Sequence, residues 1–247
     1  MKTSNENIIY RLFEAVINNK KSENISLEKF KRLKLSPSQI DIIKQIHSNP
    51  NQDTLNALGV KSVKTQRNTN ILSKLIPYLQ KEKRLNIIDN KINNGISIGA
   101  GKGIEAKQFN LKTHEPFPIN WNPDYTSLDG SDIPSNAFDF AVNTYVLNVV
   151  GKDTRDTIVK TIGRVLKPNG FAIIVTRGTD VIKPKGVYVQ IGPMEIITRS
   201  EGELTYQKGF TLTELINYVQ SVLGPSFTVE PQNGTKPDSV KIRIHKN

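Results

Sequence analysis

The sequence contains no cysteine and only three histidines, His47, His114 and His245, which lie far apart along the chain. The absence of cysteine excludes disulfides, thiolate metal ligands and a cysteine nucleophile. The scattered histidines do not predict a metal site. No apolar run approaches the roughly 20 residues that cross a bilayer, and residues 1–7 lack the apolar core of a signal peptide. We therefore expect a cytoplasmic protein that neither crosses a membrane nor holds a metal ion.

Positive charge is distributed unevenly. Residues 1–84 hold 16 of the 34 Lys and Arg but only 7 of the 23 Asp and Glu, a net charge of +9, whereas the rest of the chain is at +2. A basic segment beside a nearly neutral one predicts an anionic partner, most commonly nucleic acid, bound through the N-terminal part. A lysine-rich, solvated surface of helices would give the same counts, so both interpretations stay open.

The basic segment has the pattern of short helices. Residues 7–17 place apolar groups at helical spacing, and residues 36–39 (Ser-Pro-Ser-Gln) have the form of a capping box at a helix start. Residues 55–63 and the helix-like run at about 68–80 resemble two helices around a glycine turn. This pattern fits either a helix-turn-helix or an ordinary helix pair. We predict a helical N-terminal segment over residues 1–84.

From residue 95 onward, strands alternate with helices. The predicted strands are 95–98, 111–115, 138–143, 171–176, 227–229 and 240–244, and the predicted helices are 153–166 and 212–223. Thr211 and Glu214 form a capping box at the start of the last helix, and Gly224 ends it. Continuously apolar strands favour a parallel sheet covered on both faces. We therefore predict an α/β fold over residues 85–247, with a mostly parallel, Rossmann-like sheet and helices on both faces.

A glycine-rich turn follows the first of these strands. Gly99, Gly101 and Gly103 allow a tight turn and let backbone N–H groups approach a ligand closely. Glu115 ends the second strand, where a carboxylate can accept hydrogen bonds from both hydroxyls of a ribose. The alternative interpretation makes Glu115 an exposed surface residue.

The order of the later motifs is more specific. Asp129 is followed five residues later by Pro134, then by Phe138-Asp139 before an apolar strand, and then by the sequence Leu-Lys-Pro-Asn-Gly at 166–170. In this order, over about residues 94–177, the chain resembles the class I S-adenosylmethionine-dependent methyltransferases. The resemblance implies methyltransferase activity with S-adenosylmethionine as the cofactor.

The resemblance also implies a set of cofactor contacts. The glycines would pass beneath the methionine part and the ribose, Glu115 would hold the ribose, and Asp129 with the Gly130 backbone would meet the adenine. Ile133 would pack on the adenine ring, and Asn143 would lie beside the methyl group. The implied cofactor residues are Gly99, Ala100, Gly101, Gly103, Glu115, Asp129, Gly130, Ile133 and Asn143.

Two features depart from the family pattern. Ser97 stands where the family usually has an acid, two residues before the first glycine, and the interval from Gly101 to Glu115 is short. The replaced acid is the one feature that favours a different hypothesis, in which a non-catalytic, nucleic-acid-binding protein retains the fold.

A closer resemblance is to methyltransferases found in phages and beside bacterial DNA-modification genes. It rests on Tyr-Val-Leu-Asn-Val at 145–149 and on Glu115-Pro116. Enzymes that methylate exocyclic amino groups of DNA carry Asp or Asn, two prolines and an aromatic residue. Residues 143–146 keep the amide and the aromatic ring without the prolines. We therefore predict Asn143 and Tyr145 as catalytic residues, the alternative for Tyr145 being a place in the cap and first turn of the next helix.

Two further features concern the acceptor. Trp121 either stacks on a flipped base or packs on its own domain. Residues 178–209 interrupt the usual passage from strand to helix and contain a predicted hairpin, around Gly192-Pro193, that would cover the acceptor. We expect an enzyme that methylates nucleic acid, with DNA favoured. The alternative enzyme acts on a small molecule and uses the N-terminal helices as a lid.

Overall fold

The structure is a computed structural model, and it describes residues 71–81, 87–88, 91–116, 121–183, 188–200 and 203–247. The helices predicted before residue 71 and most of the helix-turn-helix pattern lie outside the described residues.

A six-stranded sheet forms the centre of the molecule, with the strand order β10-β11-β6-β5-β3-β4. Its strands are β3 (Gly95–Ile98), β4 (Lys112–His114), β5 (Phe138–Thr144), β6 (Leu166–Thr176), β10 (Phe227–Pro231) and β11 (Val240–Lys246). Strands β4, β3, β5 and β6 are parallel, whereas β11 runs antiparallel to β6, and β10 to β11. The predicted mostly parallel, Rossmann-like sheet is confirmed.

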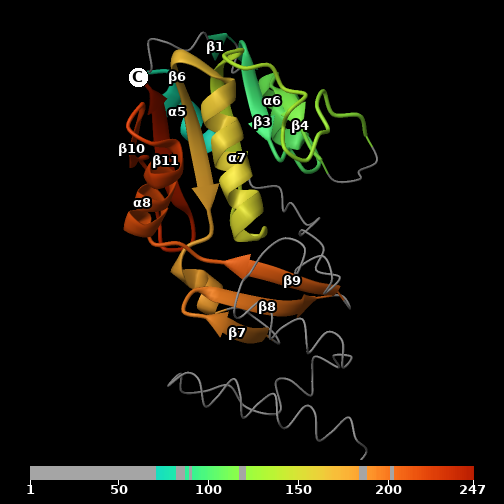
Figure 1. Cartoon of the computed structure of the whole chain (residues 1–247), viewed down its shortest axis with the longest axis vertical. Helices are drawn as coiled ribbons and strands as arrows, with labels where there is room; N and C mark the ends of the chain where they lie inside the picture. The colour runs from blue at the N-terminus through green and yellow to red at the C-terminus, as the bar shows by residue number, and fades with distance from the viewer. Residues whose placement is uncertain (1–70, 82–86, 89–90, 117–120, 184–187, 201–202) are drawn as a thin grey trace, which may run out of the picture.

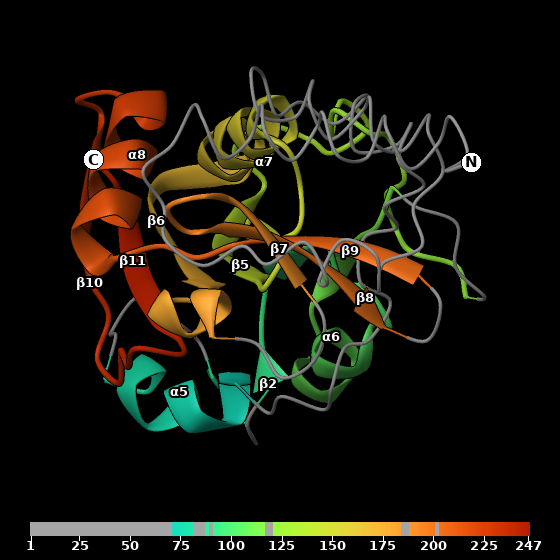
Figure 2. The same cartoon turned by 90° about the horizontal axis from the view of Figure 1, so that it is seen from below.

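Helices cover both faces of this sheet, and Figures 1 and 2 show α7 on one side and α5 on the other. The helices are α5 (Ile71–Leu79), α6 (Ile104–Phe109), α7 (Lys152–Val165) and α8 (Leu212–Leu223), with a 3-10 turn η1 (Thr179–Ile182) and a two-stranded ribbon β1 (Ile87–Ile88) and β2 (Lys91–Ile92). No helix within the described ranges is long and apolar enough to span a membrane.

Successive side chains of β6 point to opposite faces of the sheet, and each face carries an apolar core. Ala172 and Ile174 pack with α7 and α8 on what we call the α7 face, whereas Phe171, Ile173 and Val175 pack with α5 and α6 on the α5 face. Because α5 lies before residue 84 and supplies part of the second core, this helix is an integral layer of the sheet domain. The division of the chain into 1–84 and 85–247 stays a prediction.

The predicted capping box at α8 is present, since the Glu214 N–H donates to the Thr211 hydroxyl at 3.1 Å. The predicted hairpin is also present, and a third strand that the sequence did not reveal joins it. The resulting small sheet has the order β7-β8-β9, formed by β7 (Tyr188–Gly192), β8 (Glu195–Ser200) and β9 (Glu203–Lys208). Figure 1 shows the small sheet beyond the tip of β6, at the carboxyl edge of the central sheet.

Candidate cofactor and acceptor site

The glycine-rich loop lies at the carboxyl edge of β3 and β4. Gly99, Gly101 and Gly103 have φ angles of +69°, +55° and +67°, in the left-handed region that favours glycine. The N–H groups of Gly99 and Ala100 both donate to the His114 carbonyl, at 2.9 and 3.0 Å. A Cβ at Gly99 would lie 2.7 Å from the Val146 side chain. The loop is thus folded tightly across the ends of two neighbouring strands, as the sequence predicts.

Glu115 follows β4 directly and points into this loop. Its Oε2 accepts a hydrogen bond of 2.7 Å from the Gly101 N–H, and only 7% of the residue is exposed. The interpretation of Glu115 as an exposed surface residue is therefore wrong. The fold places its carboxylate beside the glycine loop, where the ribose of a nucleoside cofactor is expected.

Trp121 covers the same loop. Its indole N–H donates to the Gly101 carbonyl at 3.1 Å, and a Cβ at Gly103 would lie 3.0 Å from its ring. The ring is therefore held on its own domain, which favours the packing interpretation over stacking on a flipped base. The sequence leaves both interpretations of Trp121 open, because a loop tryptophan carries no positional signal by itself.

Side chains of α7 hold the Asp129–Gly130 turn by donating hydrogen bonds to the carbonyls of the turn. The Asp129 carbonyl accepts from the Thr161 hydroxyl at 3.1 Å, and the Gly130 carbonyl accepts from Arg164 Nη2 at 2.6 Å. The Asp129 side chain is exposed, and its Oδ1 accepts from the Ser131 N–H at 3.0 Å. That hydrogen bond lowers the pKa of Asp129. The Asp129 carboxylate is therefore ionised at physiological pH and exposed at the turn.

Asn143 lies between the ends of β5 and β3. Its side chain is fully buried, and Nδ2 donates to the Ile98 carbonyl at 2.9 Å, whereas Oδ1 has no hydrogen-bond partner. Within the described part of the chain, the buried polar side-chain atoms that lack a partner belong to His114, Asn143, Asn148, Thr176 and Asp180. All five residues lie at or just after the carboxyl ends of strands. Buried polar atoms normally have partners, so this edge is where a ligand would supply them.

Comparison with known proteins identifies the domain. A family model described as a methyltransferase domain matches residues 104–174. No curated protein matches the sequence significantly. The solved structure of the PH0226 protein from Pyrococcus horikoshii OT3 gives a TM-score of 0.54 at 12% identity, covering 78% of this chain and 99% of that one.

Two further solved structures give similar values. An S-adenosylmethionine-dependent methyltransferase from Clostridium acetobutylicum has a TM-score of 0.51 at 11% identity, covering 83% of this chain and 98% of that one. The sugar N-methyltransferase KedS8 from a Streptoalloteichus species has a TM-score of 0.50 at 9% identity, covering 74% and 89%.

Residues 104–174 thus match a methyltransferase domain, and the sheet to which they belong has the class I methyltransferase fold. The match to this family confirms the predicted enzyme class and the predicted cofactor, S-adenosylmethionine. The residues at the carboxyl edge fit this cofactor, because a glycine cradle, a buried carboxylate just after β4 and an exposed carboxylate at Asp129 lie in the order that a nucleoside ligand requires. The individual cofactor contacts stay predictions.

Two predicted roles do not agree with the geometry of the methyltransferase domain. Ile133 is 1% exposed and packs within the apolar core on the α7 face, so core packing already accounts for this side chain without an adenine ring. Tyr145 points away from Asn143: its hydroxyl bonds Ser239 Oγ at 3.1 Å, and its ring packs against the core on the α5 face. Asn143 instead bonds β3. The structure therefore does not bring the two predicted catalytic residues together.

The backbone explains the direction of the Tyr145 side chain. Tyr145 has a φ of +57°, and its N–H donates to the Val175 carbonyl at 2.7 Å, so β5 ends in a left-handed turn. Helix α7 begins only at Lys152, which also rules out a first helical turn at Tyr145. Burial raises the pKa of Tyr145, so the phenol is neutral at physiological pH.

Glu105 is a half-buried acid next to the glycine loop that sequence reasoning missed. It lies in the first turn of α6, immediately after the glycine loop, and its Oε1 accepts from the N–H groups of Ile71 and Leu72 at 2.8 and 3.1 Å. Its Oε2 accepts from the Thr144 hydroxyl at 3.4 Å. Glu105 therefore binds the start of α5 rather than replacing the family acid at Ser97, which is itself buried in β3.

Proposed function

We propose that this methyltransferase acts on a small-molecule acceptor, held at the carboxyl edge of the central sheet beneath the β7-β8-β9 sheet. The observation that carries the proposal is the position of the small sheet. It is inserted between β6 and α8, and the Lys208 N–H at the end of β9 donates to the Asn148 carbonyl, just after β5, at 2.7 Å. A cover over this edge favours an acceptor small enough to be enclosed.

S-adenosylmethionine supplies an activated methyl group on its sulfonium. In this proposal the loop from Gly99 to Gly103 carries the methionine part and the ribose, Glu115 accepts from the ribose hydroxyls, and Asp129 accepts from the adenine amino group. The hydrogen bond from the Gly101 N–H holds Glu115 in place before the cofactor binds. Such a preformed cradle lowers the entropy cost of binding.

Methyl transfer is a direct displacement, so the protein chiefly aligns the acceptor atom with the methyl group and needs at most one proton acceptor. Asn143 Oδ1, which lies at the end of β5 without a partner, would accept a hydrogen bond from an N–H or O–H of the acceptor. Tyr145 has no part in this step, because its hydroxyl bonds Ser239.

The test is transfer of label from S-adenosylmethionine to three acceptor pools: a metabolite extract of the producing cells, plasmid DNA and total RNA. We expect label in the metabolite fraction, and none with the Gly101→Leu variant, in which a side chain fills the cradle. Label that appears only on DNA or RNA would contradict the small-molecule proposal.

A second candidate function, methylation of nucleic acid with DNA favoured, is supported by the net charge of +9 on residues 1–84. In this version the basic segment would contact phosphates, and Asn143 would hold an exocyclic amino group of a base. A relationship to phage and DNA-modification enzymes and a cytoplasmic location belong to the same proposal.

A further inference from the structure

A buried arginine lies where α7 meets the small sheet. Arg155, in the first turn of α7, is 4% exposed, and its Nη1 donates to the Val150 carbonyl at 2.8 Å and to the Tyr206 hydroxyl at 3.4 Å. Its Cζ lies 5.9 Å from the Phe210 ring centroid. None of the ion pairs among the described residues involves Arg155. A charge kept buried in this way is costly, so its contacts call for an explanation beyond simple packing.

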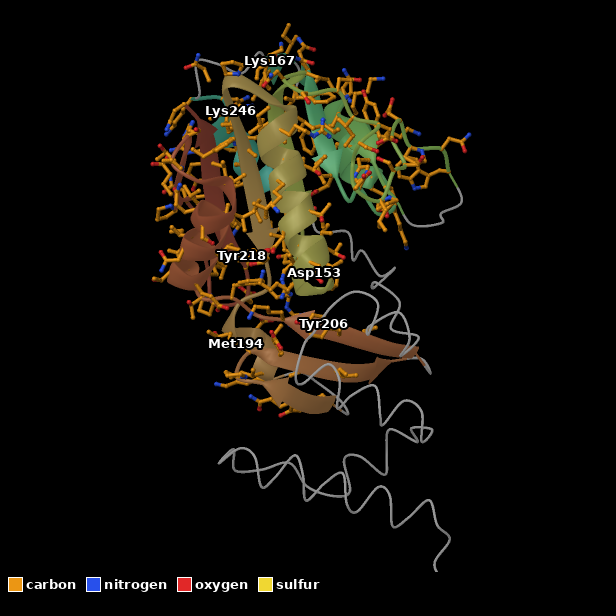
Figure 3. All side chains as sticks on the ribbon, in the orientation of Figure 1. Asp153, Lys167, Met194, Tyr206, Tyr218 and Lys246 are labelled. Atoms are coloured by element: carbon orange, nitrogen blue, oxygen red, sulfur yellow. The ribbon has the colours of Figure 1, made fainter. Side chains whose placement is uncertain are left out.

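The tyrosine that receives this arginine belongs to the small sheet. Tyr206 lies on β9 with 1% of its surface exposed, and Figure 3 labels it on the small sheet. Burial raises the pKa of Tyr206 to about 12. The phenol therefore stays neutral at physiological pH and remains a hydrogen-bond partner for the guanidinium.

The end of β9 is held from two other directions. Lys208 Nζ lies 2.9 Å from a Glu214 carboxylate oxygen on α8 and 3.5 Å from one of Glu195 on β8, and 4.9 Å from the Phe210 ring centroid. The Lys208 N–H bonds the Asn148 carbonyl. These contacts fix one end of the small sheet, whereas the Arg155 contact fixes a position inside β9.

We propose that Arg155 is a positioning residue, whose guanidinium joins the segment after β5 to β9 and so fixes the small sheet in the orientation that covers the acceptor. The Val150 carbonyl belongs to the segment that leads from Asn143 to α7, and Tyr206 belongs to the cover, so one side chain sets the distance between the two walls. The inference rests on the proposed function, because it takes the small sheet as the cover of the acceptor.

The test compares two Tyr→Phe variants in the full-length protein. Tyr206→Phe removes the hydroxyl that meets Arg155, whereas the control Tyr78→Phe removes a tyrosine hydroxyl on α5, a helix that packs in the core on the other face of the central sheet. Arg155→Lys keeps the charge but lacks the planar guanidinium, and Arg155→Met removes both.

We expect hydrogen exchange of the backbone amides in β7, β8 and β9 to accelerate at least about 5-fold in Tyr206→Phe and in Arg155→Met, with a smaller effect in Arg155→Lys and none in the control. The Kd of S-adenosylhomocysteine, measured by calorimetry, should stay unchanged in all four variants. The amount of metabolite extract that half-saturates methyl transfer should rise in the two strong variants, while the maximal rate changes less.

The possible failures can be distinguished. If the wild type labels no metabolite, the proposed function fails, and the exchange experiment still decides the role of Arg155. If the wild type is active but exchange and half-saturation are the same in Tyr206→Phe, Arg155→Met and the control, the positioning role is wrong and the proposed function stands. If the Arg155 variants instead lose cofactor affinity and show faster amide exchange equally in all parts of the chain, Arg155 stabilises the whole fold. That result would also overturn the proposal.

Discussion

Asn143 and Tyr145 lie two residues apart, yet their side chains bond in opposite directions along the sheet. Asn143 reaches β3 and Tyr145 reaches Ser239 beside β11. We expect Asn143→Ala to lower the rate of methyl transfer roughly 5- to 150-fold, the effect of losing one buried hydrogen bond, whereas Tyr145→Phe retains nearly the wild-type rate. Initial rates with labelled S-adenosylmethionine measure both. A large loss in Tyr145→Phe alone would restore the catalytic role predicted from the sequence.

Cofactor affinity depends on the glycine loop and on Asp129. Gly101 has a φ of +55°, so Gly101→Leu introduces both backbone strain and a side chain at the cradle, and binding should be abolished. Asp129→Ala removes one acceptor for the adenine and should weaken binding roughly 5- to 150-fold. Calorimetric titration with S-adenosylmethionine decides, with Asp139→Ala as a carboxylate control outside the site. Unchanged affinity in both site variants would contradict the assignment.

Glu105 gives a prediction about pH. Burial raises its pKa above the usual 4.5, and the hydrogen bonds from Leu72, Ile71 and Thr144 offset only part of this effect. Because the folded state then binds the proton more tightly than the unfolded state, Glu105 lowers the free energy of unfolding as pH rises from 4.5 through the raised pKa. Glu105→Gln, which resembles the protonated acid, lacks this dependence.

The difference in unfolding free energy, wild type minus Glu105→Gln, should therefore decrease between about pH 4 and about pH 7.5. Urea unfolding of both proteins at the two pH values measures it, and taking the difference cancels the other titrating groups. A difference that increases with pH would show that the bonds to the start of α5 outweigh burial.

At the level of elements, the strands of the central sheet and the last helix were predictable from the sequence, whereas β9 and the turn after β5 were not. The strands and α8 follow from apolar runs and from the Thr211 cap, because local chemistry alone sets them. Strand β9 was missed, since its polar sequence from Glu203 to Lys208 is apolar at few positions. The left-handed turn at Tyr145 has no glycine to announce it, so the direction of that side chain could not be read from spacing.

At the predicted cofactor site, the glycine loop and Glu115 were predictable from the sequence, whereas the packing of Ile133 and of Glu105 was not. The glycine loop and Glu115 follow from strand ends that meet at one edge, which the order of motifs specifies. Ile133 was assigned to the adenine because its position in the motif is fixed, but the motif does not say whether a residue faces the ligand or the core. The bond between Glu105 and the start of α5 joins segments 34 residues apart, and only the folded chain brings them together.

The cap of α8 provides an element-scale prediction. The Thr211 hydroxyl accepts from the Glu214 N–H, and α8 packs Leu215 and Val219 into the core on the α7 face. Thr211→Ala should lower the free energy of unfolding by about 1 kcal/mol, whereas Thr211→Ser should retain most of it. Urea unfolding measures both, and an equal loss in the two variants would mean that the methyl group rather than the hydroxyl stabilises the helix.

At the scale of the whole molecule, the two proposed acceptors make different demands on the N-terminal residues. An enclosed small molecule requires only the sheet domain, its cofactor edge and the β7-β8-β9 cover. A nucleic acid requires a cationic surface, and the net charge of +9 lies on residues 1–84. A deletion that probes this segment has to end before Ile71, because the Ile71 and Leu72 N–H groups bond Glu105. Charge substitution in the full chain leaves these bonds in place.

The last prediction therefore concerns Lys61, Lys64 and Arg67, three basic residues in one short stretch of the sequence. If they contact phosphates, the affinity for duplex DNA should fall with salt along a log–log line, and replacing all three with alanine should reduce its slope by about 0.9 for each phosphate that is no longer neutralised. Gel-shift titrations at several salt concentrations measure the slope. A control variant carries the same charge change at three exposed positions of the described domain, Lys107, Lys160 and Lys236. Non-specific attraction by net charge would lower the slope equally in both variants. Identical curves for the wild type and both variants would end the nucleic-acid proposal.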